Sequence, residues 1–301
     1  MPHFLKLAAA VLVALAALVA AAFAGATWMG ERKRNRTVDV RVVPVAPAKD
    51  AAALRQGKYL FETRGCAECH GADGRGKVVV EDPNGLLVRA PNITAGRNGA
   101  VGAYDAADWV RAIRHGVAPS GRPLLVMPSE DFNRMSDADL AALVAYTRAL
   151  PPADGEPGEV RLPPHLKALY GLGVIDDAAS RIDHRKPPAP PVPAEVSVEH
   201  GAYVASMCIG CHGASYSGGP IPGAPPHWPP ASNLTPGAGS AMARYPDAAQ
   251  FAAMMRTGKR PDGSAVSRVM PFASLGQLTD VDLAAMHEFL RRLPARATGE
   301  R

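Results

Sequence analysis

The four cysteines of the chain fall in two copies of one pentapeptide, Cys66-Ala67-Glu68-Cys69-His70 and Cys208-Ile209-Gly210-Cys211-His212. The spacing Cys-x-x-Cys-His is typical of covalent haem attachment. Each thiol can add to one vinyl group of a porphyrin, and two intervening residues let both sulfurs reach the same edge of the ring. The histidine is then carried under the iron as its proximal ligand. We therefore expect two covalently bound haem c groups, attached through Cys66, Cys69, Cys208 and Cys211, with His70 and His212 as axial iron ligands.

Two other kinds of site use the same residue types. A redox dithiol needs Cys-x-x-Cys but has no use for the histidine. A structural zinc site needs four ligands close together, and each pentapeptide supplies three. Repetition of the whole motif in a chain with four cysteines favours haem over both alternatives.

A second axial ligand closes the iron in an electron-transfer haem, and methionine in this position raises the reduction potential. Met127 lies 61 residues after Cys66 (127 − 66), and Met270 lies 62 residues after Cys208 (270 − 208). A proline follows each methionine, and we expect it to hold the ligand loop in an extended form. The paired Met-Pro positions predict Met127 and Met270 as the axial iron ligands opposite the histidines.

Other side chains in these halves are weaker candidates. Met135 corresponds to Leu278 in the second half, and Met254 and Met255 lie inside a predicted helix, so we interpret all three as core residues. His115 corresponds to Thr257, which cannot ligate iron, and we expect His115 to cap a helix end.

The two halves repeat the same elements in the same order. We expect helices near residues 50–63, 106–114 and 136–150 in the first half, the last opened by a capping box of Ser136 and Asp139. The loop Pro91-Asn92-Ile93-Thr94 has a counterpart in Asn233-Leu234-Thr235. Such a loop can supply the carbonyl that orients the proximal imidazole. Two interpretations of its polar side chains stay open: Asn92 or Thr94 reaches a haem propionate, or the loop is an ordinary polar turn.

Composition divides the 301 residues into five segments. The apolar run from Leu7 to Met29 is long enough to cross a bilayer as a helix. Ala22-Phe23-Ala24 resembles a cleavage site, but the length of the run favours a retained anchor. The expected segments are an N-terminal signal anchor with its basic flank (1–36), a tether (37–48), a first domain (49–152), a proline-rich linker (153–196) and a second domain (197–297).

The net charge of +5 does not indicate nucleic-acid binding. Four haem propionates would largely cancel it, and Arg32, Lys33, Arg34 and Arg36 form one short run beside the apolar segment. That run favours a cytoplasmic side for the rest of the chain. Haem is attached outside the cytoplasm, so the motifs indicate the opposite orientation.

These residues resemble class I cytochrome c domains joined in tandem, and they are similar to the cytochrome subunits of membrane-bound bacterial alcohol, gluconate and aldehyde dehydrogenases. The resemblance rests on the two haem motifs, the Asn-Ile/Leu-Thr and Met-Pro positions and the helix that follows Ser136 or Thr279. It implies an all-α fold of two cytochrome c-like domains behind an N-terminal transmembrane helix. It also implies that terminal helices cross near Gly57 and Tyr146, and again near Gly201 and Phe289.

The function we expect is electron transfer without bond-making chemistry, so no catalytic residue is predicted. Single electrons would pass from a periplasmic dehydrogenase or a quinol-oxidising complex to an oxidase or another cytochrome. The haem domains would lie on the periplasmic side of the inner membrane, or free in the periplasm if the N-terminal segment is cleaved. The alternatives are a dihaem cytochrome c peroxidase, which needs an open iron position, and the dihaem subunit of a cbb3-type oxidase.

Overall fold

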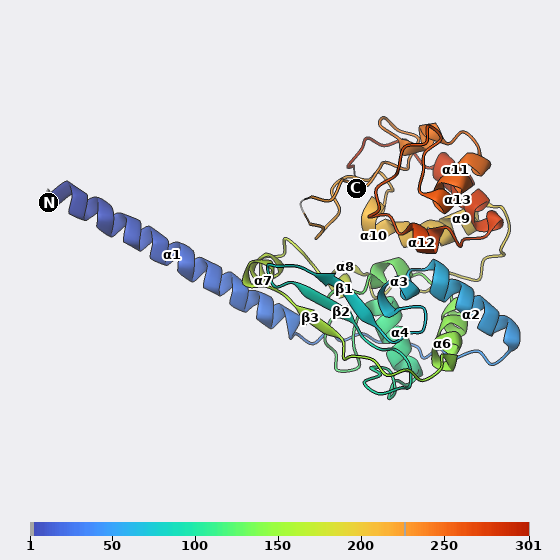
Figure 1. Cartoon of the computed structure of the whole chain (residues 1–301), viewed down its shortest axis with the longest axis horizontal. Coiled ribbons are helices and arrows are strands. Elements are labelled where there is room, and N and C mark those ends of the chain that lie inside the picture. The colour runs from blue at the N-terminus through green and yellow to red at the C-terminus, as the bar shows by residue number, and fades with distance from the viewer. Residues whose placement is uncertain (1–2, 226, 301) are drawn as a thin grey trace.

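The computed structural model describes residues 3–225 and 227–300, and its longest element is helix α1 (His3–Arg34). Alanine and leucine, both strong helix formers, dominate this segment. The apolar part of α1 is exposed and projects away from the rest of the molecule (Figure 1). By length and composition α1 is the one helix of the described residues that is suited to crossing a membrane.

The last turns of α1 pack against a helix of the connecting segment, α7 (Pro164–Gly171). Small residues allow the close approach, because a β-carbon on Gly30 would lie 2.0 Å from the Lys167 carbonyl oxygen. Lys33 forms an ion pair with Asp176, and Arg36 Nη1 lies 2.8 Å from Asp177 Oδ2. Two cations of the basic run are therefore part of a folded junction.

The first domain is built on two long helices that cross at a glycine, as the family resemblance implied. A β-carbon on Gly57 would lie 2.0 Å from the Ala142 carbonyl oxygen and 2.7 Å from Tyr146 Cβ. Tyr146 packs on Phe61, with ring centroids 5.5 Å apart. The helices of this domain are α2 (Ala51–Thr63), α3 (Cys66–His70), α4 (Ala106–His115), α5 (Ser129–Phe132) and α6 (Asp137–Ala149).

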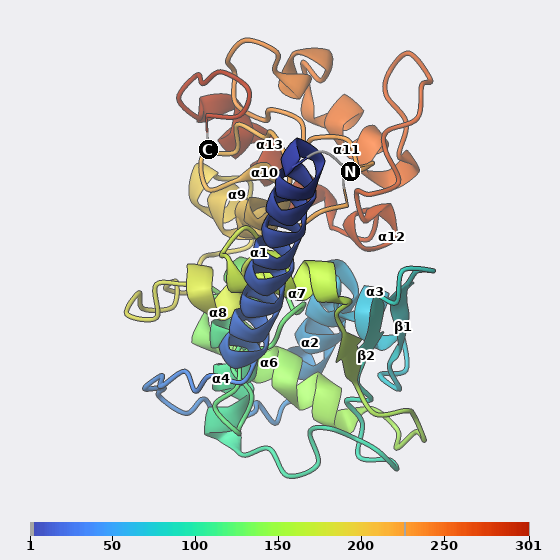
Figure 2. The same cartoon turned by 90° about the vertical axis from the view of Figure 1, so that its left-hand side faces the viewer.

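The second domain repeats this arrangement and lies beside the first (Figures 1 and 2). Gly201 crosses the last long helix, where a β-carbon would lie 2.0 Å from the Ala285 carbonyl oxygen and 2.7 Å from Phe289 Cβ. Its elements are α9 (Val198–Ala205), the 3₁₀ helix η1 (Ser206–Cys208), α10 (Ile209–His212), η2 (Ala241–Arg244), α11 (Ala248–Thr257), α12 (Phe272–Leu275) and α13 (Asp280–Arg292).

Polar side chains begin the helices at the expected places. Ser136 accepts a hydrogen bond from the Asp139 amide, but the Ser136 amide donates to the Tyr203 hydroxyl over 3.1 Å instead of completing the predicted capping box with Asp139. A complete box instead opens α4, where Asp105 and Asp108 each accept from the other's backbone N–H. The start of α4 was predicted correctly, but its capping box was not predicted.

A small antiparallel sheet was not predicted. Its strands are β1 (Lys77–Glu81), β2 (Leu87–Ala90) and β3 (Glu159–Arg161), paired in the order β1-β2-β3. The signal was present, because a valine run and a second apolar run flank Asn84-Gly85, and Asn-Gly is a strong hairpin turn signal. The all-α class still describes the two domains.

The connecting segments are more ordered than their composition indicated. Residues 37–48 run along the first domain, where the Val38 amide donates to the Gly121 carbonyl over 2.8 Å and Val40 is buried. Residues 153–196 hold β3, α7 and α8 (Ala178–Arg181) as well as the proline-rich stretch.

Candidate functional site

The first Cys-x-x-Cys-His motif forms the short helix α3. Gly65 precedes it with a positive φ of 79°, a conformation that glycine adopts without strain. Cys66 packs against the core of the first domain. Burial raises the pKa of its thiol to about 12, and burial also raises the pKa of Cys69. The Cys66 sulfur is therefore held beside the apolar core of the first domain.

The second motif begins at the end of η1 and continues through α10. Cys208 packs against the core of the second domain, and burial raises the pKa of its thiol to about 12. Within residues 3–225 and 227–300 no cysteine is in a disulfide, and no three His, Cys, Asp or Glu side chains are grouped as a metal site.

Both motif histidines are oriented by a backbone carbonyl. The Nδ1–H of His70 donates to the Pro91 carbonyl oxygen over 2.9 Å, and that of His212 donates to the Ser232 carbonyl oxygen over 2.8 Å. Burial lowers the pKa of His70, while the hydrogen bond to Pro91 opposes this effect. With Nδ1 carrying the proton, Nε2 is the nitrogen suited to a metal. A carbonyl acceptor from the Pro91–Thr94 loop was expected, and Ser232 occupies the equivalent position in the second domain.

The polar side chains of that loop hold the loop itself together. The Asn92 side chain donates to the carbonyl oxygens of Ala153 and Arg97 over 2.7 and 3.1 Å, and its own oxygen accepts from the Thr94 amide. Both side chains are buried. The turn interpretation is thus favoured over contact with a propionate.

The equivalent loop of the second domain is held in the same way. Asn233 donates to the Arg296 carbonyl oxygen over 2.8 Å and accepts from the Thr235 amide. In each domain the segment after the last helix is thereby tied to the loop that orients the histidine.

The two Met-Pro positions have the same backbone geometry. Pro128 (φ −80°, ψ 60°) and Pro271 (φ −81°, ψ 68°) each sit at the centre of an inverse γ-turn. The turn is closed by a hydrogen bond from the Ser129 amide to the Met127 carbonyl (2.8 Å), or from Phe272 to Met270 (2.9 Å). The loop therefore folds back at the proline, and the expectation of an extended form was wrong.

Each of these methionines packs, half-buried, on the same core as the cysteine of its motif. Met127 and Cys66 border the core of the first domain, and Met270 and Cys208 border that of the second. The structure thus brings one thiol of the motif and one thioether side chain to the same core in each half. Met135, Met254 and Met255 are buried in the cores, as expected.

His115 does not have the capping role that we expected. Its Nδ1 lies 3.0 Å from Nδ1 of His184, whose Nε2 donates to the Ala179 carbonyl over 2.9 Å. Because Nε2 of His184 carries the proton, the hydrogen between the two rings belongs to His115. The pair joins α4 to the connecting segment, and sequence pattern gave no sign of it.

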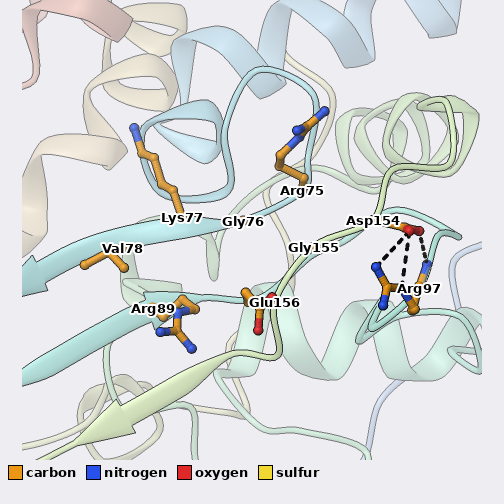
Figure 3. Close-up of a pocket in the computed structure, with 9 residues that line it drawn as sticks. All are labelled: Arg75, Gly76, Lys77, Val78, Arg89, Arg97, Asp154, Gly155 and Glu156. Carbon is orange, nitrogen blue, oxygen red and sulfur yellow. Dashed lines mark hydrogen bonds and ion pairs between the residues drawn. The ribbon is translucent and has the colours of Figure 1, made fainter.

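A cavity of about 320 Å³ opens beside the first motif and is lined by Arg75–Val78, Arg89, Arg97 and Asp154–Glu156 (Figure 3). Arg97 pairs with Asp154 over 3.1 Å, and the Gly76 amide donates to the His70 carbonyl over 2.8 Å. None of the predicted iron ligands lines this cavity. It is a basic surface next to the motif and not the haem site itself.

The residues of each half fit haem c. Two thiols precede a histidine whose ring is oriented by a carbonyl, and a thioether side chain packs on the same apolar core. This donor set is the one that a c-type haem with histidine and methionine ligands requires.

Comparison with known proteins places cytochromes in both halves. Residues 52–146 match the family described as cytochrome c oxidase, cbb3-type, subunit III, and residues 198–294 match the cytochrome c family. The fructose dehydrogenase cytochrome subunit of Gluconobacter japonicus is 28% identical over 284 residues, which are 86% of this chain and 57% of that protein.

Two further relatives match smaller parts. The alcohol dehydrogenase (quinone) cytochrome c subunit of Gluconacetobacter polyoxogenes is 28% identical over 178 residues, which are 55% of this chain and 37% of that protein. The gluconate 2-dehydrogenase cytochrome c subunit of Pantoea cypripedii is 34% identical over 100 residues, 32% and 22% of the two chains. The chain thus spans little more than half of the first relative and less of the others.

Proposed function

We propose that this chain, which carries two cytochrome c domains in tandem, is a membrane-anchored carrier that passes single electrons from a periplasmic dehydrogenase or a quinol-oxidising complex towards a terminal acceptor. Two such domains imply two covalently bound haem c groups. The observation that carries the proposal is the repetition, in both halves, of a carbonyl-oriented motif histidine and a Met-Pro turn beside one core.

The proposed roles follow the chemistry of the donors. Cys66 and Cys69 would hold one haem and Cys208 and Cys211 the other. His70 and Met127 would be the axial ligands of the first iron, and His212 and Met270 those of the second. When bound, haem c supplies an iron that gains or loses one electron.

The protein's own contribution is to hold and bury the haem groups and to orient the side chains that bind the iron. The Pro91 and Ser232 carbonyls fix the imidazole rings, and the Met-Pro turns fix the thioether loops. The relatives are named as cytochrome subunits of dehydrogenases, not as their catalytic subunits. We therefore assign no bond-making step to the chain.

Helix α1 supports retention at the membrane. It runs unbroken through Ala22-Phe23-Ala24 and into the packed junction with α7. Burial raises the pKa of Asp177 in that junction, but hydrogen bonds from Arg36 and Tyr170 outweigh it and the net shift is downward. Both domains lie at the C-terminal end of α1 (Figure 1). We propose that this end lies on the periplasmic side of the inner membrane, where haem is attached.

The names of the relatives support a dehydrogenase as the electron donor. They name fructose, alcohol and gluconate as substrates of the complexes to which those relatives belong. We propose a membrane-bound sugar or alcohol dehydrogenase as the donor class, with an oxidase or another cytochrome as acceptor.

Isolation of the chain from solubilised membranes tests the proposal. We expect two haems per chain after alkaline pyridine treatment, an intact N-terminal segment in the mature protein, and copurification with a dehydrogenase whose substrate reduces the haems. One haem per chain would show that a motif is idle. A mature protein that starts near Gly25 or Ala26 would contradict the anchor.

A second candidate is a subunit of a cbb3-type oxidase, which the match of residues 52–146 favours. The same isolation distinguishes the two functions. Copurification with a large copper-containing subunit, and reduction only through that complex, would support the oxidase subunit and contradict a dehydrogenase partner.

A further inference from the structure

Two tyrosines at equivalent positions cross from one domain to the other. Tyr59 of α2 donates its hydroxyl hydrogen to Asp282 of α13, and its oxygen accepts from the Thr279 amide over 3.1 Å. Tyr203 of α9 donates to Asp139 Oδ2 of α6 over 2.5 Å. The Tyr203 oxygen also accepts from the Ser136 amide over 3.1 Å. Each hydroxyl therefore bonds the start of the other domain's last helix.

A second pair of contacts joins each haem motif to the methionine loop of the other domain. The Gly210 amide, in the second motif, donates to Asp131 Oδ1 over 2.8 Å. The Ser274 hydroxyl donates to Glu68 Oε1, in the first motif, over 3.0 Å. A β-carbon on Gly210 would lie 3.0 Å from the Asp131 carboxylate, so the two surfaces meet closely.

Both sets of contacts are reciprocal in position. Tyr59 and Tyr203 each lie two residues after the crossing glycine, and Asp139 and Asp282 each lie three residues after the helix cap. Glu68 and Gly210 are the third residues of the two motifs, and Asp131 and Ser274 each lie four residues after the methionine. In a twofold interface, whenever two residues are in contact, their equivalents in the opposite halves are in contact as well. Both sets of contacts meet this condition, so the interface has twofold character.

One contact without a counterpart adds to the interface. Arg64, which is buried, donates through Nη1 to the Val204 carbonyl over 3.2 Å and lies 2.9 Å from Met207 Sδ. In contrast, residues 190–196 of the connecting segment are exposed along most of their length. The contacts between the domains are thus made by the domains themselves.

We propose that the two domains dock through a reciprocal, pseudo-twofold interface that includes the Tyr59–Asp282 and Tyr203–Asp139 hydrogen bonds. Residues of both haem motifs belong to this interface, and it holds the domains together even when the connecting segment is cut. This inference rests on the proposed function, because it makes one rigid body of the two electron-carrying halves. It also assigns a role to Tyr59 and Tyr203, which no haem chemistry requires.

The test uses the full-length, haem-loaded protein in detergent, with a protease recognition sequence in place of residues 190–196. After cleavage we expect the two fragments to elute together on size exclusion at micromolar concentration. The double variant Tyr59→Phe, Tyr203→Phe leaves two buried or half-buried carboxylates without these donors. We expect it to weaken the association of the cut fragments at least tenfold. Tyr104→Phe, whose ring packs on Trp109 away from the interface, is the matched control and should leave the association unchanged.

Two outcomes overturn the inference. One is separation of the cut fragments of the parent protein while each retains its haem absorption. The other is an affinity that the double variant does not change. Either result leaves electron transfer by each domain intact, whereas failure to bind haem would contradict the proposed function instead.

Discussion

Gly57 in α2 lies so close to Ala142 in α6 that a β-carbon at residue 57 would be 2.0 Å from the Ala142 carbonyl oxygen. Gly201 has the same relationship to Ala285 in the second domain. The atoms in the way belong to the backbone of a long helix, so they cannot move aside as a flexible side chain would. Each domain therefore depends on a glycine to bring its first and last helices together.

Gly57→Ala should lower the free energy of unfolding of the first domain by about 3 kcal/mol, because the added methyl group forces α2 and α6 apart. Urea unfolding followed by circular dichroism measures this. Gly102→Ala is the control, since the nearest atom to its β-carbon lies 4.0 Å away. Equal stability of the two variants would show that the helices do not cross as described.

The Met-Pro turns predict a selective effect on reduction potential. Met127→His should lower one potential by an amount on the order of 100 mV and leave the other nearly unchanged, because axial ligands set the potential of haem iron. Met270→His should act on the other haem. Redox titration of the purified protein measures both potentials.

Met135→Leu provides the control for these variants. Met135 is buried, and leucine occupies the equivalent position 278, so this substitution should preserve both potentials. If Met127→His and Met270→His also leave the potentials in place, the assignment of the second axial ligands fails.

Local sequence pattern predicted the features whose causes are local. The helix caps at Ser136 and Thr279 are set by a few neighbouring residues, and the structure has them where expected. The crossings at Gly57 and Gly201 join distant residues, and they were expected from the family resemblance rather than from local pattern. The loop at Pro128 was predicted to be extended, and this was wrong, because proline fixes φ but leaves ψ to the surrounding contacts.

Contacts between distant residues were beyond such reasoning. Tyr59 and Asp282 are separated by 223 residues, and Gly210 and Asp131 by 79. Tyr59 and Asp282 are ordinary helix side chains, and the Gly210 contact is made by its backbone amide, so no residue pattern indicates either pairing. The proline content of the connecting segment indicated an extended chain, but Pro163 and Pro164 stand at the start of α7, where proline is compatible with a helix.

The junction between α1 and α7 predicts a local effect at the C-terminal end of α1. Gly30→Leu should open this junction and raise the rate of tryptic cleavage within residues 164–185 about tenfold, as expected for a local destabilisation of 1–2 kcal/mol. Limited proteolysis of the detergent-solubilised protein measures the rate.

Gly25→Leu is the matched control, because no atom lies within 4 Å of a β-carbon at Gly25. Both variants should remain in the membrane fraction, since the apolar run is preserved. Equal cleavage rates in the two variants would contradict a packed junction.

The His115–His184 pair predicts that acid destabilises the first domain. Burial, followed by the charges of His184, Arg114 and Arg111, lowers the pKa of His115 from 6.5 to about 4. Above pH 6.5 the ring is neutral in both the folded and the unfolded chain. As the pH falls from 6.5 towards 4, the unfolded chain binds the proton first, so stability is lost in this range. Between pH 7.5 and pH 5 the loss should be about 2 kcal/mol.

His115→Thr places the residue of the equivalent position, Thr257, at this site and should remove that part of the pH dependence. Urea unfolding at pH 7.5 and pH 5 measures the free energy of unfolding of the parent and the variant. Between these two pH values the variant should lose about 2 kcal/mol less than the parent. Far-ultraviolet circular dichroism is the suitable signal, because haem absorption also responds to ligand exchange. His227→Thr, at an exposed histidine, should keep the parent's pH dependence. If both variants retain the same loss on acidification, the buried pair does not cause it.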